Sequence, residues 1–308
     1  MNKVIVIAGP TASGKTELGI EVAKQVNGEV VNFDSLLFYK ELNIGTAKPD
    51  QNELSAVPHH LVSTHSIARP INAADYSELC HPIISEIHAR ARIPILVGGS
   101  GFYLQAVMYG MFESVTSPAS VLEKSESWYQ QKGIQPFRDV LKENDPKSYE
   151  RYHENDHYRI RRAVEHFWTT GQTISSAREK QMQERQLPEG WNLFFTYLDI
   201  PKSLHLPIIE KRTEKMFQQG LIQEVKELLD AGFTGREKPM QSIGYKEVVS
   251  YLKDEFPDLE SCKERISINT RQLAKSQRTW FKKMQKNEYN PLEERDKFIK
   301  DCKQFVLD

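Results

Sequence analysis

The chain has 308 residues, of which 39% are hydrophobic and 27% charged. This composition is typical of a globular protein with one large or two modest domains, and it excludes disordered, collagen-like and coiled-coil chains. Lys and Arg number 41 against 42 Asp and Glu. The molecule as a whole is therefore not a polycation that net charge alone would draw to nucleic acid.

Hydropathy and cysteine usage indicate where the protein works. The longest apolar run near the start, residues 4–8, is far shorter than the roughly 18 residues of a membrane span or the roughly 7–15 of a signal peptide. The three cysteines are scattered and form no CxxC pair, which suits a reducing compartment. They are Cys80, Cys262 and Cys302. We therefore expect a cytoplasmic protein without membrane association.

Apolar runs predict strands that alternate with helices. Strands are expected at residues 3–8, 29–33, 93–97 and 193–198, and helices at 16–26 and 103–109. Because the strands are continuously apolar, they indicate a parallel sheet covered on both faces. From about residue 114 to 188 the sequence is polar, contains scattered aromatic residues and has helical spacing. The pattern predicts an α/β core with a helical insertion.

The loop after the first expected strand fits G-x-x-x-x-G-K-[ST] between a strand and a helix. It consists of Gly9, Pro10, Thr11, Ala12, Ser13, Gly14, Lys15 and Thr16. Its backbone N–H groups can surround a di- or triphosphate, Lys15 can neutralise the oxygens, and the Thr16 hydroxyl can bind Mg²⁺. We thus predict a P-loop NTPase-like parallel core in residues 1–113, an all-helical domain in 114–188, and core completion with basic C-terminal helices in 189–308.

Two aspartates follow expected strands. Asp34 ends the second strand, where ligand crevices of open parallel sheets lie, so it is expected to face the bound phosphate. Asp34 could equally be a helix N-cap. Asp199 ends the 193–198 strand and could supply the second metal acid of a P-loop kinase. That leaves a small-molecule kinase as one alternative.

The C-terminal region carries a basic stripe without interleaved acids. Its members, Arg271, Lys275, Arg278 and Lys282, are spaced 4, 3 and 4 and fall within about 60° of one another on a helix. Leu273, Trp280 and Met284 lie on the opposite side and are expected to pack. The stripe is either a solvated face or a surface for RNA or another phosphate-rich partner. A second cluster in the insertion, Arg159, Arg161 and Arg162, favours the RNA alternative.

A short histidine group comprises His59, His60 and His65. No cysteine or carboxylate accompanies it at zinc-ligand spacing, so packing or hydrogen-bonding roles are expected.

Eight motifs occur in an order that is specific as a set. They are Gly9-Pro-Thr-Ala-Ser-Gly-Lys-Thr16, Asp34-Ser-Leu-Leu-Phe-Tyr39, Ile44-Gly-Thr-Ala-Lys-Pro49, Pro58-His-His-Leu61, Gly98-Gly-Ser-Gly-Phe-Tyr103, Asn155-Asp156 with Arg159-Ile-Arg-Arg-Ala163, Gln241-Ser-Ile-Gly-Tyr-Lys246, and Thr270-Arg-Gln-Leu-Ala-Lys275 with Gln277 and Trp280. From residue 3 to about 285 the chain resembles the tRNA dimethylallyltransferase family, of the bacterial type without a zinc finger.

The resemblance implies a prenyl transfer in which the P-loop holds dimethylallyl diphosphate. The N6 amine of the adenosine immediately 3′ of the tRNA anticodon attacks the allylic carbon, and diphosphate leaves. Asp34 matches the general base. Lys15, Thr16 with Mg²⁺, and Arg212 match the groups that neutralise the leaving group. We expect a monomer that flips the target nucleotide out of the anticodon stem-loop.

By the same resemblance a larger set contacts tRNA. It comprises Asp34, Ser35, Leu36, Leu37, Ser100, Tyr158, Arg159, Ile160, Arg161, Arg162, Gln241, Ser242, Ile243, Gly244, Tyr245, Lys246, Arg271, Gln272, Lys275 and Arg278. Leu37 stands where many relatives have Gln, Ser100 replaces the usual Thr, and residues 112–128 lack the expected Asp-Pro and arginine pattern. Besides the kinase, a non-catalytic RNA-binding ATP switch is the second alternative.

Overall fold

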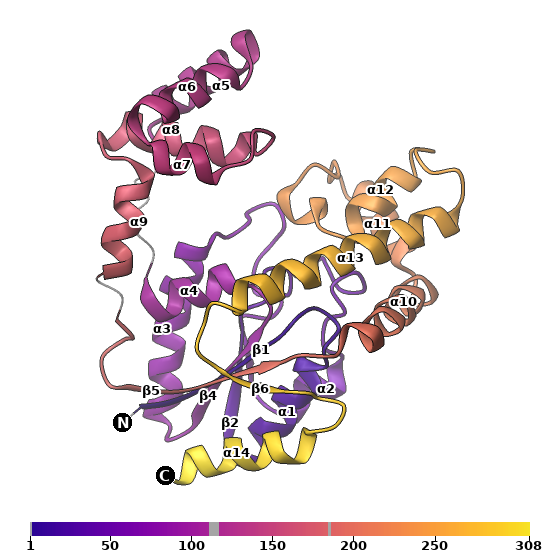
Figure 1. Ribbon diagram of the computed structural model, residues 1–308. Helices are drawn as coiled ribbons and strands as arrows, with labels where there is room; N and C mark the ends of the chain where they lie inside the picture. The colour runs from indigo at the N-terminus through magenta and orange to yellow at the C-terminus, as the bar shows by residue number, and fades with distance from the viewer. Residues whose placement is uncertain (1, 111–116, 184–185) are drawn as a thin grey trace. The chain divides into compact units, whose positions relative to one another are not determined.

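The computed structural model describes residues 2–110, 117–183 and 186–308, and its chain divides into two compact units (Figure 1). One unit consists of Met1–Val107 and Pro188–Asp308, and the other of Met108–Leu187. The expected domain boundary at residues 113 and 114 lies outside the described residues, as do residues 112–116 of the atypical stretch. A helical unit is thus inserted between two halves of an α/β unit.

The α/β unit contains a six-stranded sheet in the order β3-β2-β4-β1-β5-β6, with every pairing parallel. The strands are β1 Asn2–Ala8, β2 Gly28–Asn32, β3 His59–His60, β4 Ile93–Gly98, β5 Trp191–Leu198 and β6 Asn287–Tyr289. In the central register Ile5 lies opposite Ile95 on one side and Phe194 on the other. The predicted parallel sheet is confirmed. The edge strands β3 and β6 were not predicted, because neither has an apolar run.

Helices cover both faces of this sheet (Figure 1). They are α1 Lys15–Val26, α2 Gln51–Ala56, α3 Ala73–Ala89, α4 Gly101–Tyr109 and α14 Arg295–Leu307. The connection from β1 to β2 through α1 and the connection from β3 to β4 through α3 run in opposite directions along the sheet. Crossovers between parallel strands are right-handed as a rule, which places α1 and α3 on opposite faces. Side chains of α1 and α14 share one apolar cluster with alternate residues of β1 and β4, such as Ile5 and Val97.

The C-terminal half adds a helical layer to the same unit. Its elements are α10 Lys202–Gln218, α11 Leu221–Asp230, η1 Lys238–Gln241, α12 Tyr245–Tyr251 and α13 Leu259–Phe281. Cys262, Ile266, Ala274 and Phe281 are the buried residues of α13. Of the residues expected to pack, Leu273 and Trp280 are each 40% exposed, and Trp280 packs edge-on against Phe102 of α4. Neither α13 nor any other described helix is apolar enough over enough length to cross a membrane.

The inserted unit, in the part that the structure describes, is built from helices. They are α5 Ala119–Lys132, α6 Gln135–Asn144, α7 Pro146–Arg151, α8 His157–Thr170 and α9 Ile174–Gln183. Phe137, Ile160 and Val164 lie in its core, with Trp128 packed edge-on against Trp168. The helix α8 begins where the Asp156 side chain accepts the Arg159 N–H. This unit therefore has a core of its own.

Candidate functional site

The P-loop connects β1 to α1 and has the backbone shape of an anion-binding nest. Ala12 and Gly14 adopt positive φ angles of 62° and 77° on either side of Ser13, whose φ is not positive. An alternation of this kind is typical of backbone nests, in which successive N–H groups point the same way. The Ser13 hydroxyl in this loop is buried and has no hydrogen-bond partner among the described residues. A buried hydroxyl without a partner costs free energy unless a ligand completes it. The shape of the loop and the open hydroxyl of Ser13 thus suit an anion.

Two partly buried cations and one carboxylate meet at this loop. Lys15 Nζ donates to the Pro10 carbonyl at 2.6 Å, and burial lowers the lysine pKa to about 8. Arg212, from α10, donates to the Thr46 carbonyl at 3.2 Å, and burial lowers its pKa too. For both groups the negative charge of Asp34 opposes the effect of burial. The structure thus brings together three side chains that lie far apart in the sequence.

Asp34 is held in place by its neighbour Asn32 at the end of β2. The Asp34 N–H donates to Asn32 Oδ1 at 2.8 Å, and Asn32 Nδ2 donates both to the Asp34 carbonyl and to the Leu61 carbonyl. Asp34 Oδ1 accepts the Leu36 N–H at 3.1 Å within a turn. No helix begins here, so the N-cap alternative is wrong. The carboxylate instead lines the cavity beside the P-loop.

A cavity of about 470 Å³ opens at the carboxyl ends of the strands. Its size is within the range of small-ligand sites. Polar and apolar residues both line it, among them Asp34, Ser35, Leu36, Ser100, Arg212, Gln241, Ser242, Ile243, Gly244, Leu273, Gln277 and Trp280. A smaller cavity of about 70 Å³ shares Asp34 and Arg212 with it and reaches Lys15, Thr16 and Leu37. Many residues predicted for the site therefore line one continuous region of the α/β unit.

Two glycines between β4 and α4 allow α13 to approach this region closely. A β-carbon at Gly99 would lie 2.5 Å from Gln277 Nε2, and one at Gly101 would lie 2.1 Å from the Trp280 ring. The Gln277 side chain donates to the Gly99 carbonyl at 3.0 Å. The glycine-rich segment is thus required by packing as well as by any ligand.

The loop at residues 43–47 is held by Glu224 of α11, which the sequence analysis did not identify. The Glu224 carboxylate accepts the backbone N–H groups of Asn43 at 3.1 Å, Ile44 at 2.9 Å and Gly45 at 3.3 Å. It also accepts the Tyr245 hydroxyl. This loop then presents the Thr46 carbonyl to Arg212. No sequence signal marked Glu224, because the Ile44 N–H that it accepts lies 180 positions away in the chain.

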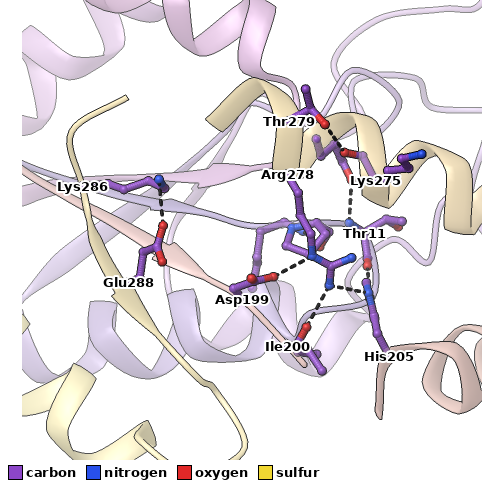
Figure 2. A network of polar contacts seen from close by, with 12 residues as sticks. Thr11, Asp199, Ile200, His205, Lys275, Arg278, Thr279, Lys286 and Glu288 are labelled. Carbon is purple, nitrogen blue, oxygen red and sulfur yellow. Dashed lines mark hydrogen bonds and ion pairs between the residues drawn. The ribbon is translucent and has the colours of Figure 1, made fainter. Parts of the chain in front are cut away.

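The Asp199 carboxylate at the end of β5 is paired with a cation. Its Oδ1 accepts Arg278 Nε at 2.7 Å, and Arg278 Nη2 donates to the Ile200 carbonyl at 2.9 Å (Figure 2). Only 17% of the Arg278 side chain is exposed. The expectation that all four cations of the basic stripe share one exposed face is therefore wrong for Arg278. The kinase alternative also loses its metal acid.

The remaining residues predicted to contact tRNA differ in exposure. Arg271, Gln272 and Lys275 are exposed on α13, and Tyr158 on α8 is 73% exposed. By contrast, Tyr245 and Ile160 are 0% and 1% exposed and belong to cores, so their side chains do not reach the surface. The three arginines of α8 are each paired with an acid: Arg159 with Asp156, Arg161 with Glu126 and Arg162 with Glu165.

The histidine group makes hydrogen bonds, as predicted. His59 Nδ1 lies 2.8 Å from the Val57 carbonyl, and His65 Nδ1 lies 2.8 Å from Thr64 Oγ1. His60 Nε2 lies 2.6 Å from the buried carboxylate of Glu29. Within the described part of the chain, no three His, Cys, Asp or Glu side chains are grouped so that they could hold a metal.

Fold and site together define an α/β protein with a P-loop-like fold and a glycine-rich loop at the switch point of a parallel sheet. A model of the IPP transferase family matches residues 37–284, and the chain belongs to that family. A tRNA dimethylallyltransferase of Acetivibrio thermocellus is 35% identical over 311 aligned residues, covering 99% of this chain and 98% of the relative. A tRNA dimethylallyltransferase of Halalkalibacterium halodurans is 36% identical over an alignment that covers 91% of this chain and 88% of the relative.

Solved structures agree with this assignment. The full-length tRNA isopentenylpyrophosphate transferase of Bacillus halodurans superimposes with a TM-score of 0.73 at 32% identity, covering 100% of this chain and 96% of that chain. A eukaryotic dimethylallyltransferase, captured acting on tRNA, gives a TM-score of 0.78 at 31% identity. The match covers 92% of this chain and 71% of that chain. The resemblance predicted from the eight ordered motifs is confirmed, and so is the predicted P-loop-like fold.

Proposed function

We propose that the protein transfers a dimethylallyl group from dimethylallyl diphosphate to N6 of the adenosine immediately 3′ of the tRNA anticodon. The observation that carries this proposal is the pattern of charge at the cavity. Two partly buried cations, Lys15 and Arg212, lie near Asp34, the one acid that lines the two cavities among the described residues. The other strand-end carboxylate, Asp199, is paired with Arg278. A diphosphate leaving group needs cations and an amine nucleophile needs one base, whereas phosphoryl transfer needs a further metal acid.

In this reaction the bond from N6 to the allylic carbon forms and the bond from that carbon to the diphosphate oxygen breaks. The nitrogen loses a proton, which the Asp34 carboxylate accepts. The leaving diphosphate gains negative charge, which Lys15, Arg212 and the N–H groups of the P-loop stabilise. Because the two cations are already in place and partly desolvated, little reorganisation accompanies the step.

The residues present fit a Mg²⁺ ion, which we propose as the cofactor. Thr16 and Asp34 line the smaller cavity with oxygen atoms, the ligand type that Mg²⁺ prefers. Thr16 would hold the ion beside the diphosphate, and the ion would supply additional neutralisation of the leaving group. With few protein oxygens on offer, the other ligands would be diphosphate oxygens and water.

The tRNA partner presents an amine that is inaccessible inside a stacked anticodon loop, so the nucleotide must be flipped into the cavity. We propose that the cavity wall of Ser100 and residues 241–244 surrounds the flipped base, supported by the polar groups that line it. Arg271 and Lys275 are exposed on α13 and suit phosphate contacts. We further propose a cytoplasmic monomer, since the α/β unit of one chain supplies the P-loop, the base and the cations.

The test is incubation of the purified chain with radiolabelled dimethylallyl diphosphate and unmodified tRNA, with and without ATP. Label should move to tRNA without ATP, and nuclease digestion should find it on the adenosine 3′ of the anticodon. ATP consumption without transfer of label would favour the kinase. ATP-dependent tRNA retention without transfer would favour the RNA-binding switch.

A further inference from the structure

The backbone of Thr11, in the P-loop, is held from two sides by residues outside the loop. Its N–H donates to Gln277 Oε1 at 2.8 Å, and its carbonyl lies 2.9 Å from His205 Nε2 (Figure 2). Gln277 comes from α13 and His205 from α10. The next residue, Ala12, has a positive φ angle of 62°, which an L-residue with a β-carbon adopts only under constraint. The two contacts at Thr11 supply such a constraint.

The hydrogen bonds assign the tautomer of His205. Its Nδ1 lies 2.8 Å from Arg278 Nη2, and a guanidinium group can only donate. Nδ1 is therefore unprotonated, so Nε2 carries the proton and donates to the Thr11 carbonyl. The imidazole is neutral, and burial lowers its pKa, which favours the same state. Arg278 thus sets which atom His205 offers to the P-loop.

Arg278 is in turn fixed by two further acceptors. Asp199 Oδ1 lies 2.7 Å from Nε and the Ile200 carbonyl 2.9 Å from Nη2, so the guanidinium plane has little freedom. Figure 2 shows Arg278 between Asp199 and His205, whereas the Lys275 side chain, one turn earlier on α13, extends away from this network. Lys275 forms no ion pair within the described residues. The two cations of the same helix therefore face different surroundings.

We propose that Arg278 and Gln277 are positioning residues for the diphosphate site, acting through His205 and Thr11 on the shape of the P-loop. The proposal rests on the proposed function, and it separates Arg278 from the exposed cations of α13. Gln277 acts directly on the Thr11 N–H, and Arg278 acts through the His205 ring. One helix then serves two ends of the reaction: Arg271 and Lys275 face solvent, and residues 277–278 hold the leaving-group loop.

The experiment compares Arg278→Gln with the matched control Lys275→Gln in the full-length chain. Binding of inorganic diphosphate with MgCl₂ is measured by calorimetry, and tRNA binding by filter retention over a range of salt concentrations. Arg278→Gln should raise the Kd for diphosphate and the KM for dimethylallyl diphosphate by about 10-fold to 100-fold, because the loop loses its shape. Its tRNA affinity and salt slope should equal those of the wild type. Lys275→Gln should leave both diphosphate constants unchanged.

A second variant keeps the proposal testable if Arg278→Gln does not fold. Gln277→Ala removes the contact to Thr11 but leaves the ion pair of Arg278 with Asp199 intact. It should raise the same two diphosphate constants, with the fold checked by circular dichroism. Loss of tRNA binding with diphosphate binding unchanged, in either variant, would overturn the proposal. Wild-type protein that binds diphosphate but transfers no prenyl group would overturn the proposed function instead.

Discussion

The cations at the cavity and those on the outer face of α13 have the same formal charge but opposite surroundings. Lys15 and Arg212 are partly buried, and burial lowers the pKa of both. Arg271 and Lys275 are exposed and make no ion pair within the described residues. A desolvated cation interacts strongly with one nearby anion, whereas an exposed cation is screened by water and salt. We therefore expect large, ligand-specific effects from the cavity and small, salt-dependent effects from the helix surface.

The arginines of α8 differ from both of these groups of cations. Each is paired with an acid of its own unit, and the Arg161 side chain also lies over the Tyr129 ring at 4.6 Å from its centroid. A phosphate would have to compete with these carboxylates. A count of basic residues therefore overstates the positive charge available to a nucleic acid.

The largest expected effect is at the carboxylate of the cavity. Asp34→Asn should still bind tRNA and diphosphate but lose turnover by about 10²–10⁴, because the amide cannot accept the proton of the amine. Single-turnover transfer of labelled dimethylallyl groups measures the loss. Near wild-type turnover in this variant would show that another residue is the general base and that Asp34 has no catalytic role.

The second largest effect is expected from substitution of the two cations at the cavity. Lys15→Ala and Arg212→Ala should each reduce kcat by about 10²–10³, the range for removing one group that stabilises developing negative charge. Affinity for tRNA, measured by filter retention, should stay almost unchanged, since both side chains are assigned to the leaving group. An equal loss of tRNA binding would mean that buried and exposed cations do not differ in role.

A smaller effect is expected at the carboxylate that holds the 43–47 loop. Glu224→Gln keeps one acceptor but loses the charge that faces three backbone N–H groups, so kcat/KM should fall about tenfold and urea unfolding should show a loss of about 1–3 kcal/mol. Glu227→Gln on the same helix is the control, because Glu227 is exposed and bonds only to Gln223 in the described structure. Equal effects of the two variants would count against the role of Glu224.

The smallest effects belong to the helix surfaces. Lys275→Gln should weaken all tRNA substrates about uniformly and flatten the log–log salt dependence by up to about one unit. Arg161→Gln should flatten it less, since Glu126 already pairs with Arg161 at 2.7 Å. Filter binding between about 50 and 200 mM salt measures both slopes. Identical slopes in the wild type and in Lys275→Gln would make α13 a merely solvated face.

Much of the core was predictable because its signals are local. The four strands predicted from apolar runs are present, since strands buried on both faces of a parallel sheet consist mostly of apolar residues. The short edge strands β3 and β6 are formed by pairing alone, with two and three polar or aromatic residues, and no pattern within them distinguishes a strand from a loop. The 40% exposure of Leu273 and Trp280 was not predicted for a related reason, because the elements packed against α13 determine which of its residues are buried.

Within the site, residue types were predicted better than their partners. The P-loop and Asp34 follow from strand ends and glycine spacing, and the structure brings them together at one cavity. Arg212 came from the family resemblance, and its contact with Thr46 bridges 166 positions of the chain. Glu224 and His205 carried no sequence signal at all, because each is an ordinary helical residue until its distant partner is known.

The sequence by itself determined the anion-binding loop and the parallel core, because eight consecutive residues and short apolar runs act through sterics and hydrophobicity at close range. Only the tertiary structure decided which charges are free. Arg278 and Asp199 lie 79 positions apart but 2.7 Å from each other, while Lys275, three residues from Arg278, faces solvent. Electrostatic interactions depend on separation in space and on burial, and a linear pattern of charges specifies neither.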